Sequence, residues 1–173
     1  MIDTVLAIVN DDAFENEWSL VMPTFPGCLD PVGINLRAVK VTSPDLQFEK
    51  YDVHYKTEKV QKPSGKQSTD KILTIDFRID KYYSAYRSFQ NWFNLIHNHE
   101  NGTASADYVG GVSAIRIPIT LMLLDANGIP TATAEVYKGC FIDKVPSRNY
   151  TYESGNPLVL SYTFSYLNMI MMK

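Results

Sequence analysis

Residues 73–80 read Leu73-Thr74-Ile75-Asp76-Phe77-Arg78-Ile79-Asp80, and apolar side chains alternate with polar ones along the stretch. This alternation is typical of a β-strand with one buried face, so it predicts a strand over 71–80. Asp80 suits the N-cap of a following helix, because a capping carboxylate accepts hydrogen bonds from first-turn amides. Apolar residues then recur at helical spacing in one broad stripe, at Tyr82, Tyr86, Phe89, Trp92, Phe93 and Ile96. A helix with such a stripe must lie on a sheet.

Alternating stretches on both sides of this unit predict further strands at 17–23, 34–41, 115–123, 131–142 and 158–167. Asp125-Ala126-Asn127-Gly128 predicts a turn that folds two of them into an antiparallel hairpin. Gly139 is expected to be a bulge, because glycine inside a strand often marks one. The predicted fold class is therefore mainly β with one flanking α-helix (α+β), an antiparallel β-sandwich or barrel-like core in a single domain over 1–173.

Residues 48–70 differ from the rest, because a few β-forming side chains give way to a polar, lysine-rich stretch. We expect a protruding hairpin arm or a long loop, since long polar insertions in compact domains are usually functional or disordered. Its candidates for contact with another copy are Lys50, Lys56, Lys59, Lys62 and Lys66. The C-terminal extension 168–173 contains Met169-Ile170-Met171-Met172, which should either pack on its own subunit or be covered by a neighbour.

The composition, 45% hydrophobic, 12% aromatic and 20% charged, fits a folded globular protein. A formal net charge of -3 argues against tight nucleic-acid binding, which needs a basic surface, but it is compatible with a surface that DNA slides past. The first residues lack the basic start of a signal peptide, and no stretch approaches the length of a membrane span. Cys28 and Cys140 are expected as reduced thiols, while a bridge within a chain or between copies stays open.

The sequence offers no convincing catalytic, cofactor-binding or metal-binding constellation. Gly65-Lys66 does not complete a phosphate loop, because Val60 and Gln67 stand where that motif needs glycine and Ser or Thr. His97 and His99 would point about 200° apart on a helix, which is too far to share one metal ion easily. We therefore expect no catalytic residue, no cofactor and no metal, and an enzyme ranks last among the function classes.

Three stretches together resemble the tail tube proteins of contractile-tailed bacteriophages, a group related to the tube proteins of contractile injection systems. They are the strand 72–80 leading into the helix with Tyr86, Phe89 and Trp92, the hairpin turn followed by 137–142, and the final strand 160–166. The resemblance implies hexameric rings stacked into a hollow tube, with a tail sheath protein, baseplate proteins and tail-terminator proteins as partners. It also implies a virion component, assembled in the host bacterial cytoplasm, through which genomic DNA passes without specific binding, and no membrane partner.

In such a tube the strands should turn apolar side chains into each subunit's core and polar ones toward the lumen. A polar, weakly acidic lining would repel phosphates and keep DNA mobile. The candidate lumen residues are Thr74, Asp76, Arg78, Thr133, Glu135, Ser161, Thr163 and Ser165.

Two other functions stay open at this stage. The arm and the apolar tail have no match in the resemblance, so a baseplate-proximal tube initiator, a terminator or a secretion-system tube protein is an alternative. A small-ligand-binding β-barrel is the second, with Trp18, Trp92 and several tyrosines lining a pocket. Self-assembly separates these readings, because a ligand binder would stay monomeric or dimeric.

Overall fold

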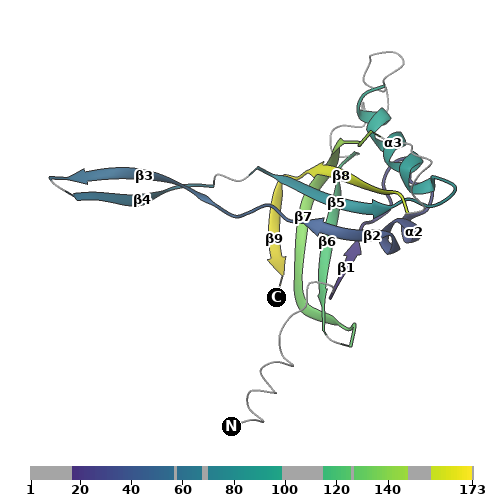
Figure 1. Cartoon of the computed structure of the whole chain (residues 1–173), viewed down its shortest axis with the longest axis horizontal. Coiled ribbons are helices and arrows are strands. Elements are labelled where there is room, and N and C mark those ends of the chain that lie inside the picture. The colour runs from purple at the N-terminus through teal and green to yellow at the C-terminus, as the bar shows by residue number, and fades with distance from the viewer. Residues whose placement is uncertain are drawn as a thin grey trace, which may run out of the picture.

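The computed structural model of the chain describes residues 17–56, 58–67, 70–98, 115–125, 127–147 and 157–172. Every strand pair in it is antiparallel. The elements, labelled in Figure 1, are β1 (Trp18–Val21), α2 (Pro31–Leu36), β2 (Ala38–Thr42), β3 (Phe48–Tyr55), β4 (Glu58–Gln67), β5 (Ile72–Arg78), α3 (Ser84–Ile96), β6 (Ile117–Leu124), β7 (Pro130–Lys144), β8 (Val159–Ser165) and β9 (Asn168–Met172).

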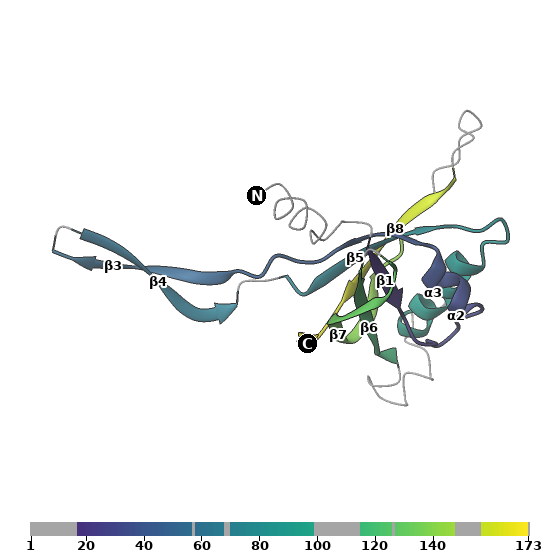
Figure 2. The same cartoon turned by 90° about the horizontal axis from the view of Figure 1, so that it is seen from below.

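Seven strands form one sheet in the order β1-β6-β7-β8-β5-β2, with β9 added to β7 beside this path. The long strand β7 belongs to two parts of that sheet. Its first part pairs with β6 and β9, and we call these strands with β1 the β6 half. Its last residues, Phe141–Lys144, pair with β8, and we call β8, β5 and β2 with them the β8 half. Figures 1 and 2 show the two halves running across one another.

Gly139 lies where β7 passes from one half to the other. Its φ of +67° is left-handed, a conformation that glycine adopts at little steric cost. The β6–β7 register shifts at the same place, between the pairs Ile119↔Tyr137 and Ile117↔Cys140. The structure therefore confirms the predicted bulge, and the bulge bends the sheet.

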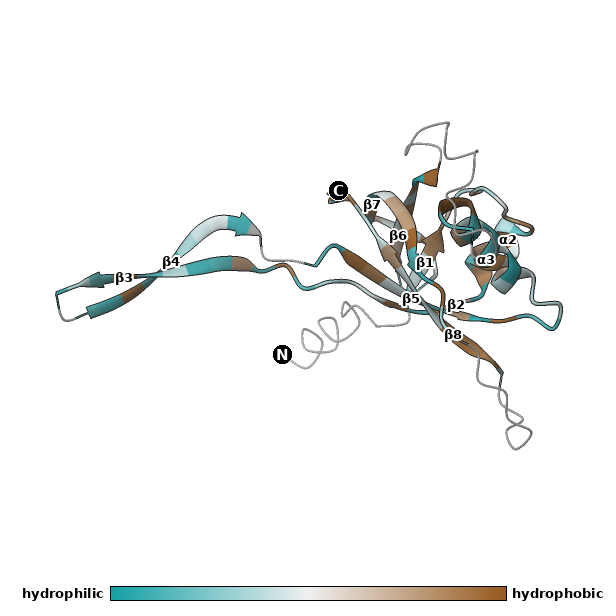
Figure 3. Cartoon of the chain, turned by 90° about the horizontal axis from the view of Figure 1, so that it is seen from above, coloured by the Kyte–Doolittle hydropathy of each residue, from teal (hydrophilic) through white to brown (hydrophobic). Residues whose placement is uncertain are grey.

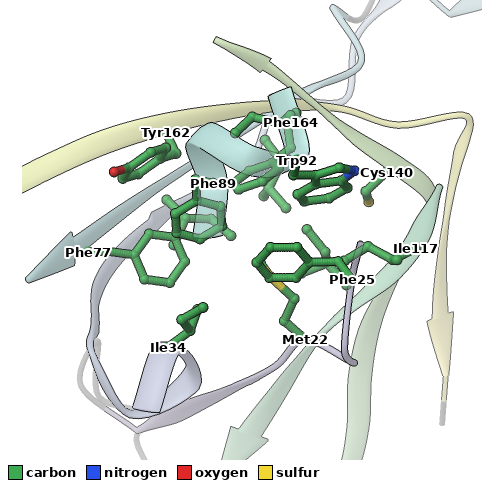
Figure 4. Packing of buried hydrophobic residues seen from close by; sticks show 14 of the residues in the cluster. Met22, Phe25, Ile34, Phe77, Phe89, Trp92, Ile117, Cys140, Tyr162 and Phe164 are labelled. Carbon is green, nitrogen blue, oxygen red and sulfur yellow. The ribbon is translucent and has the colours of Figure 1, made fainter. Parts of the chain in front are cut away.

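The core lies between the two halves and is closed at one end by α3. Along β5 and β8 the alternating residues Leu73, Ile75, Phe77, Leu160, Tyr162 and Phe164 are buried, as the sequence pattern predicted. From α3, Phe89 and Trp92 enter this cluster, and Figure 4 shows their rings among those of Phe25, Phe77, Tyr162 and Phe164. The ring of Phe89 lies 4.4 Å from that of Tyr162, and the ring of Trp92 lies 4.7 Å from that of Phe25. Tyr86 and Ile96 pack against the edge of the cluster.

The start of α3 differs from the prediction. The N-cap position is held by Tyr83, at φ +56°, and the helix begins at Ser84 rather than directly after Asp80. Asp80 still caps this end from outside, because its carboxylate accepts hydrogen bonds from the Ser84 hydroxyl at 2.8 Å and the Ala85 amide at 3.3 Å. Burial pushes the pKa of Asp80 upward, but these hydrogen bonds outweigh it and hold the pKa below its usual value. Tyr82 precedes the helix and is exposed, so it does not belong to the apolar stripe.

The strand predicted over 34–41 is wrong in its first part. Residues 31–36 form the short helix α2, and the strand β2 begins only at Ala38. Asp30 accepts a hydrogen bond from the Gly33 amide at 2.9 Å, and Pro31 occupies the first turn, where its missing N–H costs nothing. These local helix-start signals override the apolar alternation of Ile34 and Leu36.

The remaining strand predictions hold, and the fold class is confirmed as a sheet-rich, antiparallel α+β protein. The hairpin of β6 and β7 turns at Asp125, whose carboxylate accepts hydrogen bonds from the Asn127 and Ile129 amides. The sheet does not close into a barrel within the described residues, because β1 and β2 are not paired with each other. Trp92 fills the core and its indole N–H donates to the Ile115 carbonyl at 2.9 Å, so it does not line a ligand pocket. The predicted helix stop at 101–102 lies outside the described residues.

We expect Trp92→Ala to lower the free energy of unfolding by about 3–5 kcal/mol, because it removes a fully buried aromatic side chain and a buried hydrogen bond. Urea unfolding followed by circular dichroism measures the change. The exposed Tyr82→Ala serves as control and should shift stability by less than about 0.5 kcal/mol. Equal effects of the two substitutions would show that α3 is not packed into the core.

We expect Gly139→Ala to destabilise more than Gly128→Ala. Both glycines have a positive φ, so each alanine has a backbone cost of roughly 1–2 kcal/mol. A Cβ at Gly139 would also lie 2.7 Å from Cδ1 of Leu167, whereas a Cβ at Gly128 meets nothing within 4 Å. Thermal melts of both variants test this, and Leu167→Ala in the Gly139→Ala background should recover the difference. A Gly139→Ala variant no less stable than Gly128→Ala would contradict the close packing at the bend.

Candidate assembly surfaces

Three strands of the sheet have an edge with no partner among the described residues. They are β1, paired only with β6; β2, paired only with β5; and β9, paired only with β7. An open edge presents unpaired backbone N–H and C=O groups, which makes it a template for another strand.

The edge strand β9 is apolar as well as open. The C-terminal extension packs on its own subunit, where Val136 lies opposite Ile170 and Ala134 opposite Met172. Even so, Met171 and Met172 remain 53% and 56% exposed. Natural proteins usually protect an edge with charge or proline, and β9 has neither, so this edge is suited to a contact with another chain.

The outer face of the β8 half gathers six of the eight predicted lumen residues. In the β5–β8 register Thr74 lies opposite Thr163, Asp76 opposite Ser161, and Arg78 opposite Val159. Ser165 follows on the same face of β8, opposite Ile72. Because the other face of both strands is buried, these side chains form one polar surface that points away from the core.

Thr133 and Glu135 do not lie on this surface. They belong to the part of β7 in the β6 half, where Glu135 lies opposite Leu121. The carboxylate of Glu135 accepts a hydrogen bond of 2.7 Å from the buried Tyr137 hydroxyl and one of 3.3 Å from Ser43. Burial is the main cause that raises the pKa of Tyr137, so its phenol stays a proton donor. Glu135 therefore has internal hydrogen-bond partners and lies apart from the other six residues.

The polar surface is also not acidic. Register places Lys40 of β2 opposite Asp76 and Lys144 of β7 opposite Thr163, so both lysines join Arg78 on this face. These strands therefore contribute the cations of Lys40, Arg78 and Lys144 to it beside the carboxylate of Asp76, and the exposed Asp143 lies next to Lys144 at a register shift in β7. The weakly acidic lining that the sequence suggested does not describe this surface.

The arm is a two-stranded hairpin of β3 and β4 that projects far from the sheet (Figure 1). Figure 3 shows that hydrophilic residues dominate it, with short hydrophobic segments between them. Register separates two faces: Tyr51, Val53, Tyr55 and Val60 share an aromatic face, while Lys50, Asp52, His54 and Lys59 share a charged face. Because an isolated hairpin is marginally stable in water, the exposed aromatic face is a natural contact surface.

The five predicted arm lysines have different surroundings. Lys59 forms a 2.8 Å ion pair with Asp52 on the charged face. Lys62 reaches across the aromatic face and donates to the Tyr55 hydroxyl at 2.9 Å. Lys56 occupies the turn at φ +49°, and Lys50 and Lys66 are exposed. Because Lys59 and Lys62 already have partners within the arm, Lys50, Lys56 and Lys66 are the lysines most available to another copy.

Two contacts tie the base of the arm to the rest of the molecule. On the β3 side, Ser43 joins Glu135 and Tyr137, with 2.8 Å between the two hydroxyl oxygens of Ser43 and Tyr137. On the β4 side, the Lys71 ammonium donates to the Leu167 carbonyl at 2.6 Å. The partners of Ser43 lie on β7, and Leu167, the partner of Lys71, directly precedes β9. These contacts could not be predicted from the sequence, because the paired residues are 92, 94 and 96 positions apart in the chain.

An open groove of about 1560 Å³ separates the free edges of β1 and β2. Buried Leu20 and Leu121 form its floor, and Trp18 stands on one wall. Leu36 and Val39, both exposed, stand on the other wall. The groove exists because the bent sheet stops short of closing. No local pattern in the sequence predicts this groove, because β1 and β2 are distant in the chain; Trp18, named above for a ligand pocket, is one of its lining residues.

Other chemistry is sparse in the described part of the chain. Cys28 and Cys140 are free thiols and form no bridge with each other. Burial raises the pKa of the Cys140 thiol to about 12. Within the described residues no three His, Cys, Asp or Glu side chains gather around a possible metal position. His99 lies outside those residues. None of the described helices is both long and apolar enough to cross a membrane.

The sequence matches no family model and no curated protein. Solved structures do match. A chain from the cryo-EM structure of an extracellular contractile injection system, the PVC sheath/tube terminator in its extended state, gives a TM-score of 0.65 at 12% identity, with 94% of this chain and 97% of that chain covered. A chain from the PVC sheath-tube complex gives 0.64 at 13% identity, covering 98% and 97%.

A third match comes from the anti-feeding prophage cap, the AFP tube terminating cap, with a TM-score of 0.62, 14% identity and coverage of 96% and 98%. Similarity at this level of identity establishes the fold. The chain therefore has the fold of the tube and tube-terminator proteins of contractile injection systems, as its resemblance to contractile tail tube proteins predicted.

Proposed function

We propose that this chain is a structural subunit of a contractile tail tube, in which six copies close into a ring and rings stack into a hollow conduit. The observation that carries the proposal is the outer face of the β8 half. It is polar throughout β5 and β8 from Thr74 to Arg78 and from Ser161 to Ser165, while the inner face is fully packed. One face of this sheet packs in the core, the other is polar and faces solvent, and the sheet ends in a free edge at β2. Such a sheet suits the wall of a water-filled channel.

Ring closure is the role we assign to the free edges. When one patch of a subunit joins a different patch of the next, the contact repeats around an axis and closes if the rotation permits. This chain offers an apolar, uncharged edge at β9 and separate free edges at β1 and β2, so one copy can present different patches to its two neighbours. Head-to-tail contacts between unlike edges would also cover Met171 and Met172.

Ring stacking is the role we assign to the arm. Its length carries Tyr51, Tyr55 and Val60 well beyond the sheet, and these side chains have no core of their own to enter. Packing of the aromatic face on the next ring would stabilise the hairpin and the stack together. The exposed lysines would set orientation more than affinity, as charges at the rim of an interface do.

The finer parts of the proposal concern cargo and partners. We assign the tube to a bacteriophage virion, assembled in the host cytoplasm, within a sheath and between a baseplate and a terminator. DNA would pass through the lumen without specific recognition. The three cations of the polar surface would attract phosphates, so transit should be slowest at low salt, where charge attraction is least screened.

A tube terminator or cap is the second candidate, and two of the three structures reported above favour it, because they come from terminator or cap assemblies. A cap and a tube subunit share the fold and the ring contact. They differ in whether the ring can add another identical ring on both sides.

We expect purified protein to form hollow tubes in negative-stain electron micrographs as its concentration rises. Tubes of variable length would support the tube subunit. Single rings that never stack would favour the terminator or cap instead. Protein that stays monomeric at high concentration would contradict both, because the open edges would then have no role.

We expect a shortened arm to abolish stacking and spare the fold. Removing 52–61 and joining Tyr51 to Lys62 through Asn-Gly keeps the pairing at the arm's base, because Tyr51 and Lys62 are register partners. The melting temperature should stay close to that of the intact chain, and micrographs should show rings without tubes.

Two matched arm variants separate the faces. One replaces Tyr51 and Tyr55 with serine, and the other replaces Lys50 and Lys66 with serine. Loss of stacking in the first alone would assign the contact to the aromatic face, and loss in the second alone to charge. Normal tubes from the shortened arm would rule out its role in stacking.

A further inference from the structure

We infer that the groove between β1 and β2 receives the N-terminal segment, residues 1–16, of a neighbouring copy. The inference rests on the proposed self-assembly and names one contact within it. Its basis is the chemistry of the groove, which selects among the segments that a second copy of this chain could offer.

The groove combines an apolar floor with a cationic rim. Leu20 and Leu121 lie at the bottom, and the backbone edges of β1 and β2 face one another across it. Arg37, Lys40 and Arg78 line it, against the single carboxylate of Glu17. Within the described residues none of the three cations forms an ion pair, so the rim favours an occupant that is both apolar and acidic.

Charge excludes the arm as the occupant. Residues 48–67 carry five lysines against Glu49, Asp52 and Glu58, so the arm has an excess of positive charge like that of the groove. Two cationic surfaces repel, and juxtaposed like charges disfavour a contact. The strand β9, residues 168–172, carries no charge and would leave the cations of the rim without partners.

The N-terminal segment has the composition that the groove requires. Residues 1–16 contain no Lys or Arg and four acidic residues, Asp3, Asp11, Asp12 and Glu15. Its apolar residues include the β-branched Ile2, Val5, Ile8 and Val9 together with Leu6, which favour an extended strand. An extended segment can add to a free sheet edge through its backbone while its side chains fill the pockets below.

A neighbour is the better source of this segment than the same copy. Glu17 and Trp18 line the groove themselves, so the chain already leaves from its wall. To lie beside β1 in its own groove, the chain would have to reverse its direction immediately before Glu17, within residues 12–16. Donation to the next copy needs no such reversal and joins adjacent subunits head to tail.

A charge-swap experiment in the full chain tests the contact. Asp11→Lys with Asp12→Lys should raise the concentration needed for assembly by roughly tenfold, because attraction to the rim becomes repulsion. Arg37→Glu with Lys40→Glu should do the same, and the four substitutions together should restore assembly. Lys81→Glu, an exposed charge change outside the groove, is the control and should have no effect. Failure of the combined variant to recover would overturn the charge match.

Disulfide trapping then identifies the donor. Cys28→Ser chains carrying either Val5→Cys or Val39→Cys, one of them enlarged by a tag, are mixed and oxidised. A disulfide between the tagged and the untagged chain supports donation between copies. A third Cys28→Ser chain carries both Val5→Cys and Val39→Cys, and a disulfide that forms only within this chain, and not between the mixed chains, overturns it. Tubes without either disulfide would refute the N-terminal contact and leave the proposed function standing. Cross-linked pairs that never form rings or tubes would refute the proposed function alone.

Discussion

The bend in β7 at Gly139 is the constraint on which the rest of the structure depends. One strand of 15 residues pairs with β6 and β9 along its first part and with β8 at its end, so both halves of the sheet share a backbone. A left-handed residue at the bend lets the chain change direction without losing the ladders on either side. The bend places the buried faces of the two halves toward one interior, and α3 then needs only to close its open end.

That arrangement explains how much of the fold could be predicted. The buried faces of β5 and β8, the Asp125 turn and the bulge at Gly139 all follow from local rules of alternation and turn chemistry, and they were predicted. Residues 31–36 were not, because Asp30 and Pro31 start a helix that apolar spacing alone does not reveal. Tyr82 fitted a helical stripe by spacing, but the chain turns through Tyr83 before the helix begins.

The grouping of the candidate site residues could be predicted from the sequence only where it depends on the alternation of side chains along a strand. Thr74, Asp76, Ser161 and Thr163 share a face because paired strands keep their side chains in register. Glu135 also follows the alternation of side chains along its strand, but that part of β7 belongs to the β6 half. There the hydroxyls of Ser43 and Tyr137 donate hydrogen bonds to its carboxylate. The charge of this surface could not be predicted for a similar reason, since Lys40 and Lys144 reach it through pairings of distant segments.

The structure also separates the parts of the chain that are packed within one copy from the parts that are left exposed. The aromatic cluster around Phe89 and Trp92 is complete within one chain, so a subunit has a folded core before it meets another. The open edges and the arm remain, and they are not independent of each other. The base of the arm is held by Tyr137 on β7 and by the Leu167 carbonyl next to β9. If a neighbour pairs with β9, as we propose, it would act on the anchors at the base of the arm, so the contact at this edge and the contact made by the arm would be coupled.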